Sequence, residues 1–227
     1  MVAQITRLTG ILIVSAVFAS ADVIYNVSLS TAPLIGHPAG PFALDFQFND
    51  GSASGDANNT ALIRNFSFGT GSPVGAPTFV GGATGNLGSS ITLTDSLFVN
   101  HFIQGFNPGA TISFQMVLST NLDSGIFQDQ LGFAILDRSG SGLPTLGPAN
   151  VFLILNLDPG MPTVSTFRSA AFLSPNAGGP PIDIAAPQVS IVPESNSLLL
   201  ITLALGGIGI ATRRKHRGNR KESSPMR

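Results

Sequence analysis

The sequence predicts an all-β fold, with a β-sandwich or jelly-roll-like domain between two apolar terminal segments. Several short runs alternate apolar residues with polar or small ones, which is the period of a strand with one buried face. Clusters of Gly, Pro, Asn, Asp and Ser separate these runs, and no convincing 3.6-residue stripe occurs between them. Many short strands with frequent turns favour a sandwich, and a single up-and-down barrel is the alternative.

The clearest strands alternate strictly along their length. In residues 42–48, Phe42, Leu44, Phe46 and Phe48 fall on one face and Asp45 on the other. Residues 23–29 and 111–118 repeat this pattern. Shorter candidate strands are 62–68, 78–80, 90–94, 97–103, 131–136, 151–157 and 163–167.

Phenylalanine dominates the aromatic residues, with 16 Phe against one Tyr and no Trp. The simplest interpretation is a Phe-rich core between two sheets. Faces that bind sugars by stacking usually present Trp or Tyr, whose polar edges suit a wet surface. Their near absence weakens a carbohydrate-stacking hypothesis without removing it.

The first 21 residues have the pattern of a secretory signal peptide, which we expect to be helical. Arg7 precedes an apolar run over residues 8–19, and Ala19, Ser20 and Ala21 place small residues where a signal peptidase reads. We therefore expect cleavage after Ala21. The alternative is a short anchor that is never cut, but the run is short for a membrane span.

A second apolar run, residues 198–211, is followed at once by Arg213, Arg214 and Lys215. The predicted transmembrane helix over 197–212 would be about 24 Å long at about 1.5 Å per residue. A typical hydrocarbon core is about 30 Å thick, so the span is short but usable with bilayer thinning. A buried core helix is the alternative, although a linker precedes this run and a basic terminus follows it.

These features divide the chain into five parts. Residues 1–21 are the signal peptide, and 22–173 form the β domain. Residues 174–191 are rich in Pro, Gly and Ala, which suits an extended linker. Residues 192–217 hold the C-terminal signal with its transmembrane helix, and 218–227 form a basic cytoplasmic tail.

Charge separates sharply along the chain. Between residues 22 and 192 there are ten aspartates, three arginines and no lysine, a balance of −7, whereas seven bases and one acid beyond residue 211 give +6. Basic flanks stay on the cytoplasmic side of a membrane, so we expect an exported domain and a cytoplasmic C-terminus. An acidic domain also argues against binding nucleic acid.

Residues for catalysis are sparse. The absence of cysteine excludes thiol chemistry and cysteine-bound metals. Only His37 and His101 lie in the β domain, 64 positions apart. Both fit turn or surface positions better than a catalytic or zinc-binding site. The segment 51–55 resembles a nucleophile elbow but carries Ala53 where serine would stand. We expect no enzyme and no cofactor; paired aspartates in a glycosidase remain a minor alternative.

Asp50 and Asp56 are weak candidates for a calcium site. With Asn49, Asn58 and Asn59 they gather oxygen ligands in one loop, as calcium requires. No glutamate closes the loop in the manner of an EF-hand. A solvated loop rich in Asp and Asn is the favoured alternative, because these residues often bond their own backbone in turns.

The C-terminal segment resembles a bacterial PEP-CTERM sorting signal. The resemblance lies in Val192, Pro193 and Glu194, in the apolar run with its glycines, and in the basic cluster headed by Arg213, Arg214 and Lys215. Ser195 stands where the family usually has a second proline. The segments 44–49, Leu-Asp-Phe-Gln-Phe-Asn, and 102–114 also resemble a group of PEP-CTERM proteins of unknown activity.

This resemblance implies export, transient anchoring in the inner membrane and processing by an exosortase, followed by release to the cell surface or exterior. It implies signal peptidase, exosortase and membrane lipid as partners, and an association with exopolysaccharide and biofilm. The leading hypothesis is therefore a non-enzymatic protein of the cell envelope or extracellular matrix. The alternative is a secreted module that binds exopolysaccharide.

Overall fold

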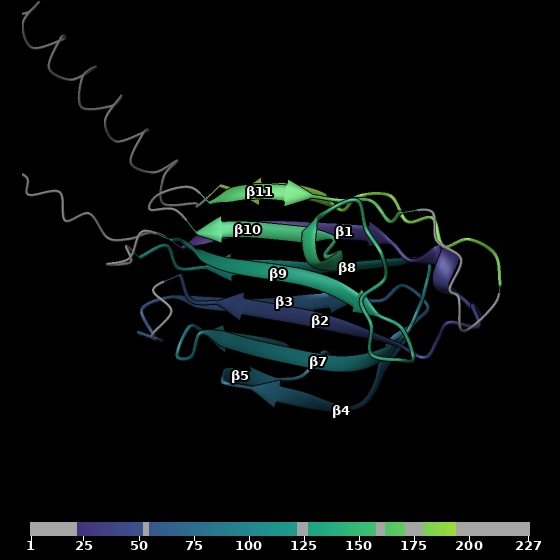
Figure 1. Cartoon of the computed structure of the whole chain (residues 1–227), viewed down its shortest axis with the longest axis horizontal. Helices are drawn as coiled ribbons and strands as arrows, with labels where there is room; N and C mark the ends of the chain where they lie inside the picture. The colour runs from purple at the N-terminus through teal and green to yellow at the C-terminus, as the bar shows by residue number, and fades with distance from the viewer. Residues whose placement is uncertain (1–21, 52–54, 122–126, 158–161, 171–178, 194–227) are drawn as a thin grey trace, which may run out of the picture.

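A computed structural model describes residues 22–51, 55–121, 127–157, 162–170 and 179–193. Its strands form two six-stranded antiparallel sheets (Figure 1). Sheet A has the order β12 (Gln188–Val192), β1 (Val23–Ser30), β8 (Thr111–Leu118), β3 (Thr60–Ser67), β6 (Ser90–Thr94), β5 (Gly82–Gly85). Sheet B has the order β11 (Thr163–Thr166), β10 (Leu153–Leu157), β9 (Asp129–Leu136), β2 (Phe42–Asn49), β7 (Val99–Asn107), β4 (Ser72–Val80). The all-β, sandwich-like prediction is confirmed.

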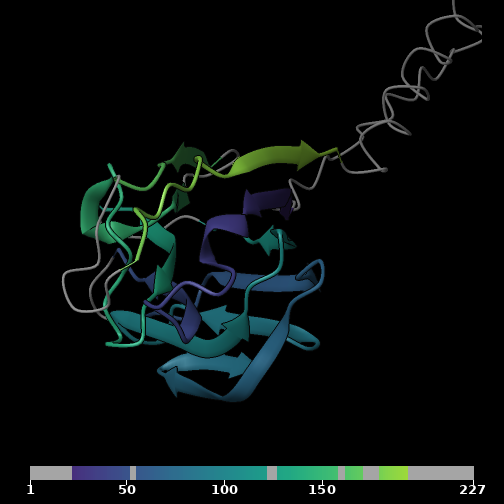
Figure 2. The same cartoon turned by 90° about the vertical axis from the view of Figure 1, so that its right-hand side faces the viewer.

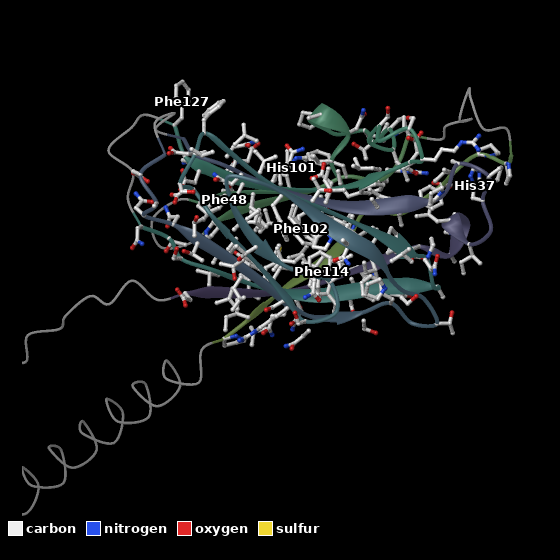
Figure 3. All side chains as sticks on the ribbon, turned by 90° about the horizontal axis from the view of Figure 1, so that it is seen from below. His37, Phe48, His101, Phe102, Phe114 and Phe127 are labelled. Carbon is white, nitrogen blue, oxygen red and sulfur yellow. The ribbon has the colours of Figure 1, made fainter. Side chains whose placement is uncertain are left out.

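The sheets pack face to face through phenylalanine side chains. The Phe46 ring on β2 lies 5.3 Å from that of Phe114 on β8, in the opposite sheet, and 5.0 Å from Phe133 on β9. Phe114 and Phe133 are themselves 5.2 Å apart. Figure 3 shows Phe48, Phe102 and Phe114 between the layers. The predicted Phe-rich core is therefore present. Phe114 meets Phe46 and Phe133 edge to face, whereas Phe46 and Phe133 are stacked, and aromatic pairs favour edge-to-face and offset-stacked arrangements.

The alternating pattern places the side chains as expected. On β2, Phe42, Leu44, Phe46 and Phe48 are all buried in the core. Asp45 is the exception, because it belongs to the outer face and is nevertheless only 3% exposed. Two single-turn 3-10 helices, Ala32–Leu34 and Pro148–Asn150, complete the elements of the described residues.

Part of the sequence-predicted linker belongs to the folded domain. β12 pairs antiparallel with β1, and Ile182 and Ile184 are buried in the main core. The Ser169 amide donates to the Ile184 carbonyl (2.9 Å), and the Ile184 amide donates to Ser169 Oγ (2.7 Å). The alternating Ile182, Ile184 and Val189 supply the inward face that the surrounding Pro, Gly and Ala residues obscure in the sequence. The domain therefore extends to Pro193.

One end of the sandwich gathers both ends of the described domain, and we call it the terminal end. β1 begins there and β12 ends there, since Ile24 pairs with Val192. The registers of sheet A bring the end of β8 and the start of β3 to the same end. Asn59, just before β3, bonds to Asp129 at the start of β9, so the end of β2 and the start of β7 in sheet B lie at this end too. Figure 2 turns the sandwich by 90° and shows the two layers.

The predicted signal peptide and transmembrane helix lie outside the described residues, as do Ala19, Ala21, Glu194, Arg213, Arg214 and Lys215. Within the described ranges, no helix has the length and apolar character needed to cross a bilayer. Those assignments stay predictions.

Candidate functional site

A row of polar side chains crosses the outer face of sheet A. The registers align Ser190, Asn26, Gln115, Arg64 and Ser90 across five neighbouring strands. Gln115 Nε2 donates to Asn26 Oδ1 (3.2 Å), and Arg64 Nε donates to Gln115 Oε1 (3.0 Å). Four strand spacings of about 4.8 Å make the row about 19 Å long. We call it the polar row.

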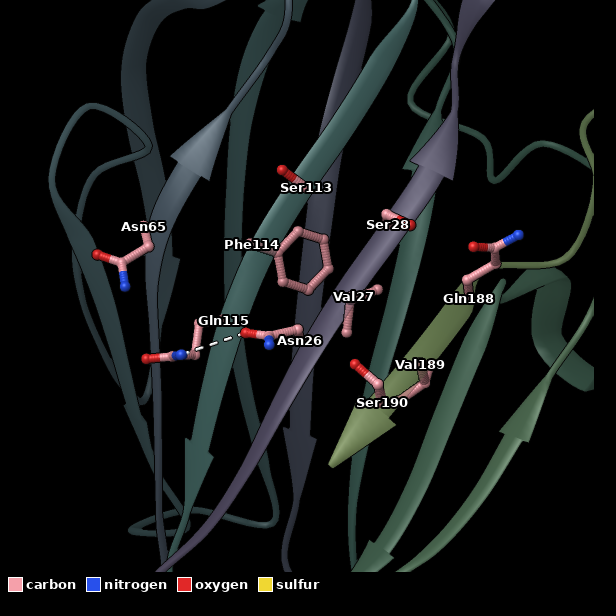
Figure 4. A pocket seen from close by; sticks show the side chains of 10 residues that line it. All are labelled: Asn26, Val27, Ser28, Asn65, Ser113, Phe114, Gln115, Gln188, Val189 and Ser190. Atoms are coloured by element: carbon pink, nitrogen blue, oxygen red, sulfur yellow. Dashed lines mark hydrogen bonds between the residues drawn. The ribbon is translucent and has the colours of Figure 1, made fainter. Parts of the chain in front are cut away.

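The polar row borders a shallow hollow of about 410 Å³. Figure 4 shows its lining, in which Asn26 and Gln115 meet side chains from β1, β8 and β12. Ser28, Ser113, Gln188 and Ser190 add hydroxyl and amide groups. Val27 and Phe114 also line the hollow, although their side chains are buried in the core. This volume is within the range of small-ligand sites, about 300–1,000 Å³.

A bulge in β3 shapes one side of the hollow. The register of β3 against β8 shifts between Arg64 and Ser67, and Asn65 there has a φ of 57°. Asparagine is among the few non-glycine residues that adopt this left-handed conformation readily. Bulges re-aim side chains in this way, and Asn65 adds another amide to the lining.

The polar row is chemically neutral apart from Arg64. Amides and hydroxyls both donate and accept hydrogen bonds, so this face matches a ligand rich in hydroxyl groups. The outer face of sheet B carries polar side chains as well, but Ala134, Val151 and Ile154 form a second apolar cluster on it with Phe167 packed against them. The polar face of sheet A is therefore the better candidate for binding a polar polymer.

Sheet B brings together one acid–base pair that the sequence does not reveal. His101 Nε2 on β7 contacts Asp45 Oδ1 on β2, and Gln47 Nε2 donates to Asp45 Oδ2 (3.1 Å). The pairing of Gln47 with His101 places Asp45 two residues away on the same face. Such a contact between positions 56 residues apart depends on the strand register alone. Its bonds satisfy a carboxylate that is buried on the outer face of β2.

His37 lies in a turn, as the sequence predicts, but it is buried. Its Nε2 bonds to the Pro180 carbonyl (2.9 Å), and its Nδ1 accepts from the Ala39 amide (3.0 Å). The ring therefore carries its proton on Nε2. These bonds tie the turn after β1 to the segment that leads into β12, which is a structural role.

Three aspartates are buried at the terminal end, where they hold the loops together. Asp50, Asp95 and Asp129 are each 1% exposed or less. Asp129 accepts from the Gly51 amide (2.8 Å) and from Asn59 Nδ2 (2.9 Å). Asp95 Oδ2 accepts from the Asn59 amide (3.0 Å). The cluster thus connects three loops from both sheets.

The structure brings the calcium candidates Asp50 and Asp56 together through the backbone. Asp50 Oδ2 accepts from the Asp56 amide (3.1 Å), and Asp56 accepts from the Asn58 amide (3.2 Å) and side chain (3.0 Å). These are the local bonds expected of an Asp- and Asn-rich loop. Among the residues that the structure describes, no group of three or more His, Cys, Asp or Glu side chains could hold a metal ion.

Burial raises the pKa of the Asp95 carboxyl. Hydrogen bonds with the Asp129 side chain and the Asn59 backbone oppose this rise, and the charge of Asp56 adds to it. Two carboxyl groups can share a hydrogen bond only if one of them holds a proton. Asp95 Oδ1 is also buried, and it has no hydrogen-bond partner in the described part of the chain.

We expect Asp95→Asn to stabilise the protein at neutral pH. A raised pKa in the folded state means that Asp95 favours folding when protonated, and that this contribution is lost as pH rises above about 3.8, its unfolded value. The asparagine amide keeps a donor in place at every pH. Thermal unfolding at pH 7 should give a melting temperature about 2–4 °C higher, the shift that about 1 kcal/mol produces in a domain of this size.

The gain should shrink as the pH falls toward about 3.8, where the carboxyl takes up a proton in the unfolded chain as well. Asp137→Asn, in an exposed turn where the carboxylate accepts from the Ser139 amide (2.8 Å), is the matched control and should not stabilise the protein at pH 7. A Tm for Asp95→Asn that is equal to or below that of the native chain at pH 7 would contradict the raised pKa of Asp95.

The sorting residues can be placed only at their start. Val192 ends β12, and Pro193 follows it as the last described residue. The folded domain therefore reaches the first residues of the predicted signal.

Comparison with known proteins gives no relative. No family model, no curated protein and no solved structure matches the chain.

Proposed function

We propose that this chain is an exported, non-enzymatic protein of the cell envelope or extracellular matrix, sorted by its C-terminal signal and processed by an exosortase. The observation that carries the proposal is the charge division along the chain, −7 over residues 22–192 and +6 beyond residue 211. The positive flank opposes translocation, whereas a domain with few bases can be exported.

The fold supports this proposal through its boundary. Because β12 ends at Val192, the sorting signal begins directly where the sandwich ends. An enzyme that reads Pro193 and Glu194 would meet them beside a folded β domain. Proline resists both helix and strand pairing, which keeps this junction extended.

A second candidate function is binding of exopolysaccharide by the polar row. The specific observation is the hydrogen-bonded series Asn26, Gln115 and Arg64, which lies across the strands beside a hollow lined with amides and hydroxyls. A sugar chain placed along it would exchange hydrogen bonds with successive side chains. The scarcity of Tyr and Trp means that stacking contributes little, so affinity would rest on hydrogen bonds.

The double variant Asn26→Ala/Gln115→Ala tests this binding. Loss of two ligand hydrogen bonds, at about 0.5–1.5 kcal/mol each, should weaken the affinity about tenfold. Affinity electrophoresis of the full chain in exopolysaccharide purified from the host would measure the change.

The matched control is Gln130→Ala/Asn156→Ala, which removes an equivalent cross-strand amide pair from sheet B, where Gln130 Nε2 donates to Asn156 Oδ1 (2.8 Å). It should bind as the native chain does. Equal retention of both variants, or no retention of the native chain, would rule out the polar row as the binding face.

A further inference from the structure

The terminal end of the sandwich carries an exposed apolar group. Leu97 is 51% exposed, Phe98 56% and Phe127 68%. Leu97 and Phe98 lie in the loop between β6 and β7, and Phe127 precedes β9. We call these three residues the apolar tips. Two phenylalanines that are more than half exposed stand out in a domain whose core is built from buried phenylalanine rings.

The aspartate cluster holds the apolar tips together. The Asp50 amide donates to the Phe98 carbonyl (3.1 Å), and the Gly51 amide donates to Asp129, two residues beyond Phe127. Gly51 packs so closely on the Phe127 backbone that no Cβ would fit there. These contacts fix the backbone of the apolar tips relative to one another. The tips can therefore enter a membrane interface together.

The chain leaves the domain at this same end. β12 ends at Val192 beside Ile24, and β7 begins at Val99, directly after Leu97 and Phe98. Figure 3 shows Phe127 at the opposite end of the sandwich from His37. Only four residues separate Pro193 from the start of the apolar run at Leu198, which makes five Cα–Cα steps. Fully extended, they span at most about 18 Å.

We infer that the apolar tips rest on the lipid bilayer that the C-terminal run enters. The inference depends on the proposed anchoring, because the short tether then holds the terminal end against the membrane. Phenylalanine and leucine side chains gain free energy by leaving water for the interfacial region. Asp22 and Asp56 are also exposed at this end, which favours zwitterionic over anionic headgroups.

This orientation sets the direction of the polar row. With the terminal end on the membrane, the strands of the sandwich run roughly perpendicular to the bilayer surface. The polar row crosses the strands, so it lies parallel to the membrane. A polysaccharide chain running along the cell surface could then occupy it without bending.

The absence of tryptophan provides a direct test. Phe98→Trp and Phe127→Trp each introduce a single indole at the apolar tips. Ile35→Trp is the matched control, because Ile35 is 54% exposed and lies next to Ala32–Leu34 at the far end. The full chain is reconstituted into phosphatidylcholine vesicles, with and without lipids brominated on their acyl chains.

Both tip probes should shift their emission to the blue and lose most of it to brominated lipid, while Ile35→Trp keeps its emission. Thermal unfolding of each variant checks that it folds, and either tip probe alone reports on this end. Flotation with the vesicles tests the anchoring separately. A chain that does not float overturns both the anchoring and this inference, whereas a floating chain with unquenched tips, or with Ile35→Trp quenched equally, overturns the inference alone.

Discussion

Replacing Phe46 with alanine should destabilise the domain by about 3–5 kcal/mol, the cost of removing a large aromatic side chain from a packed core. The Phe46 ring is fully buried and contacts the rings of Phe114 and Phe133 in both sheets. Domains of this kind are stable by about 5–15 kcal/mol in total, so much of the margin would be lost. Urea unfolding of the full chain in mild detergent would measure the change.

Phe127→Ala is the matched control, since the same substitution at a 68% exposed ring should change the free energy of unfolding by less than about 0.5 kcal/mol. Equal effects at the two positions would mean that the sheets do not pack through Phe46. The comparison tests the sandwich directly because, of these two residues, Phe46 packs between the sheets and Phe127 does not.

Neutralising the basic cluster should randomise the orientation of the protein in the membrane. In the variant, Arg213, Arg214, Lys215 and Arg217 are all replaced by glutamine. Each of these cations opposes passage through the bilayer, where an arginine at the centre costs about 2.5–3.5 kcal/mol on insertion scales. Without them, most of the protein should lose the fixed orientation in which the C-terminus stays in the cytoplasm. Protease protection of a C-terminal epitope in intact cells would detect this.

The control for this variant is Arg220→Gln/Lys221→Gln, which removes charge further from the apolar run and should leave the orientation unchanged. If the four-residue variant is protected to the same degree as the native chain, the basic cluster does not set the topology.

The strands could be predicted from the sequence where one face is buried and the other is exposed to solvent. In β2 and β8 every second residue is apolar, and this alone identifies their inward faces. β4 was only partly predicted, because Pro73, Gly75 and Pro77 interrupt its pattern. The structure accommodates them since β4 is an edge strand, with a register shift between Val74 and Thr78. β12 was missed because the segment before it has the composition of a linker.

The candidate site could not be predicted from the sequence because it depends on strand pairing. Asn26, Gln115 and Arg64 each occupy an ordinary solvent-facing position in their own strand. Only the order β1, β8, β3 makes them neighbours. The same holds for Asp45 and His101, which meet across β2 and β7. In contrast, the local bonds of Asp50 and Asp56 follow from the turn chemistry of their own loop.

Mass spectrometry of the protein isolated from its native host tests the proposed export and sorting most directly. The account predicts a mature chain that begins at Asp22, ends before the basic cluster at Arg213 and is recovered from the envelope or the medium. Recovery of an intact chain from the cytosol, with Met1 and Arg227 both present, would contradict it.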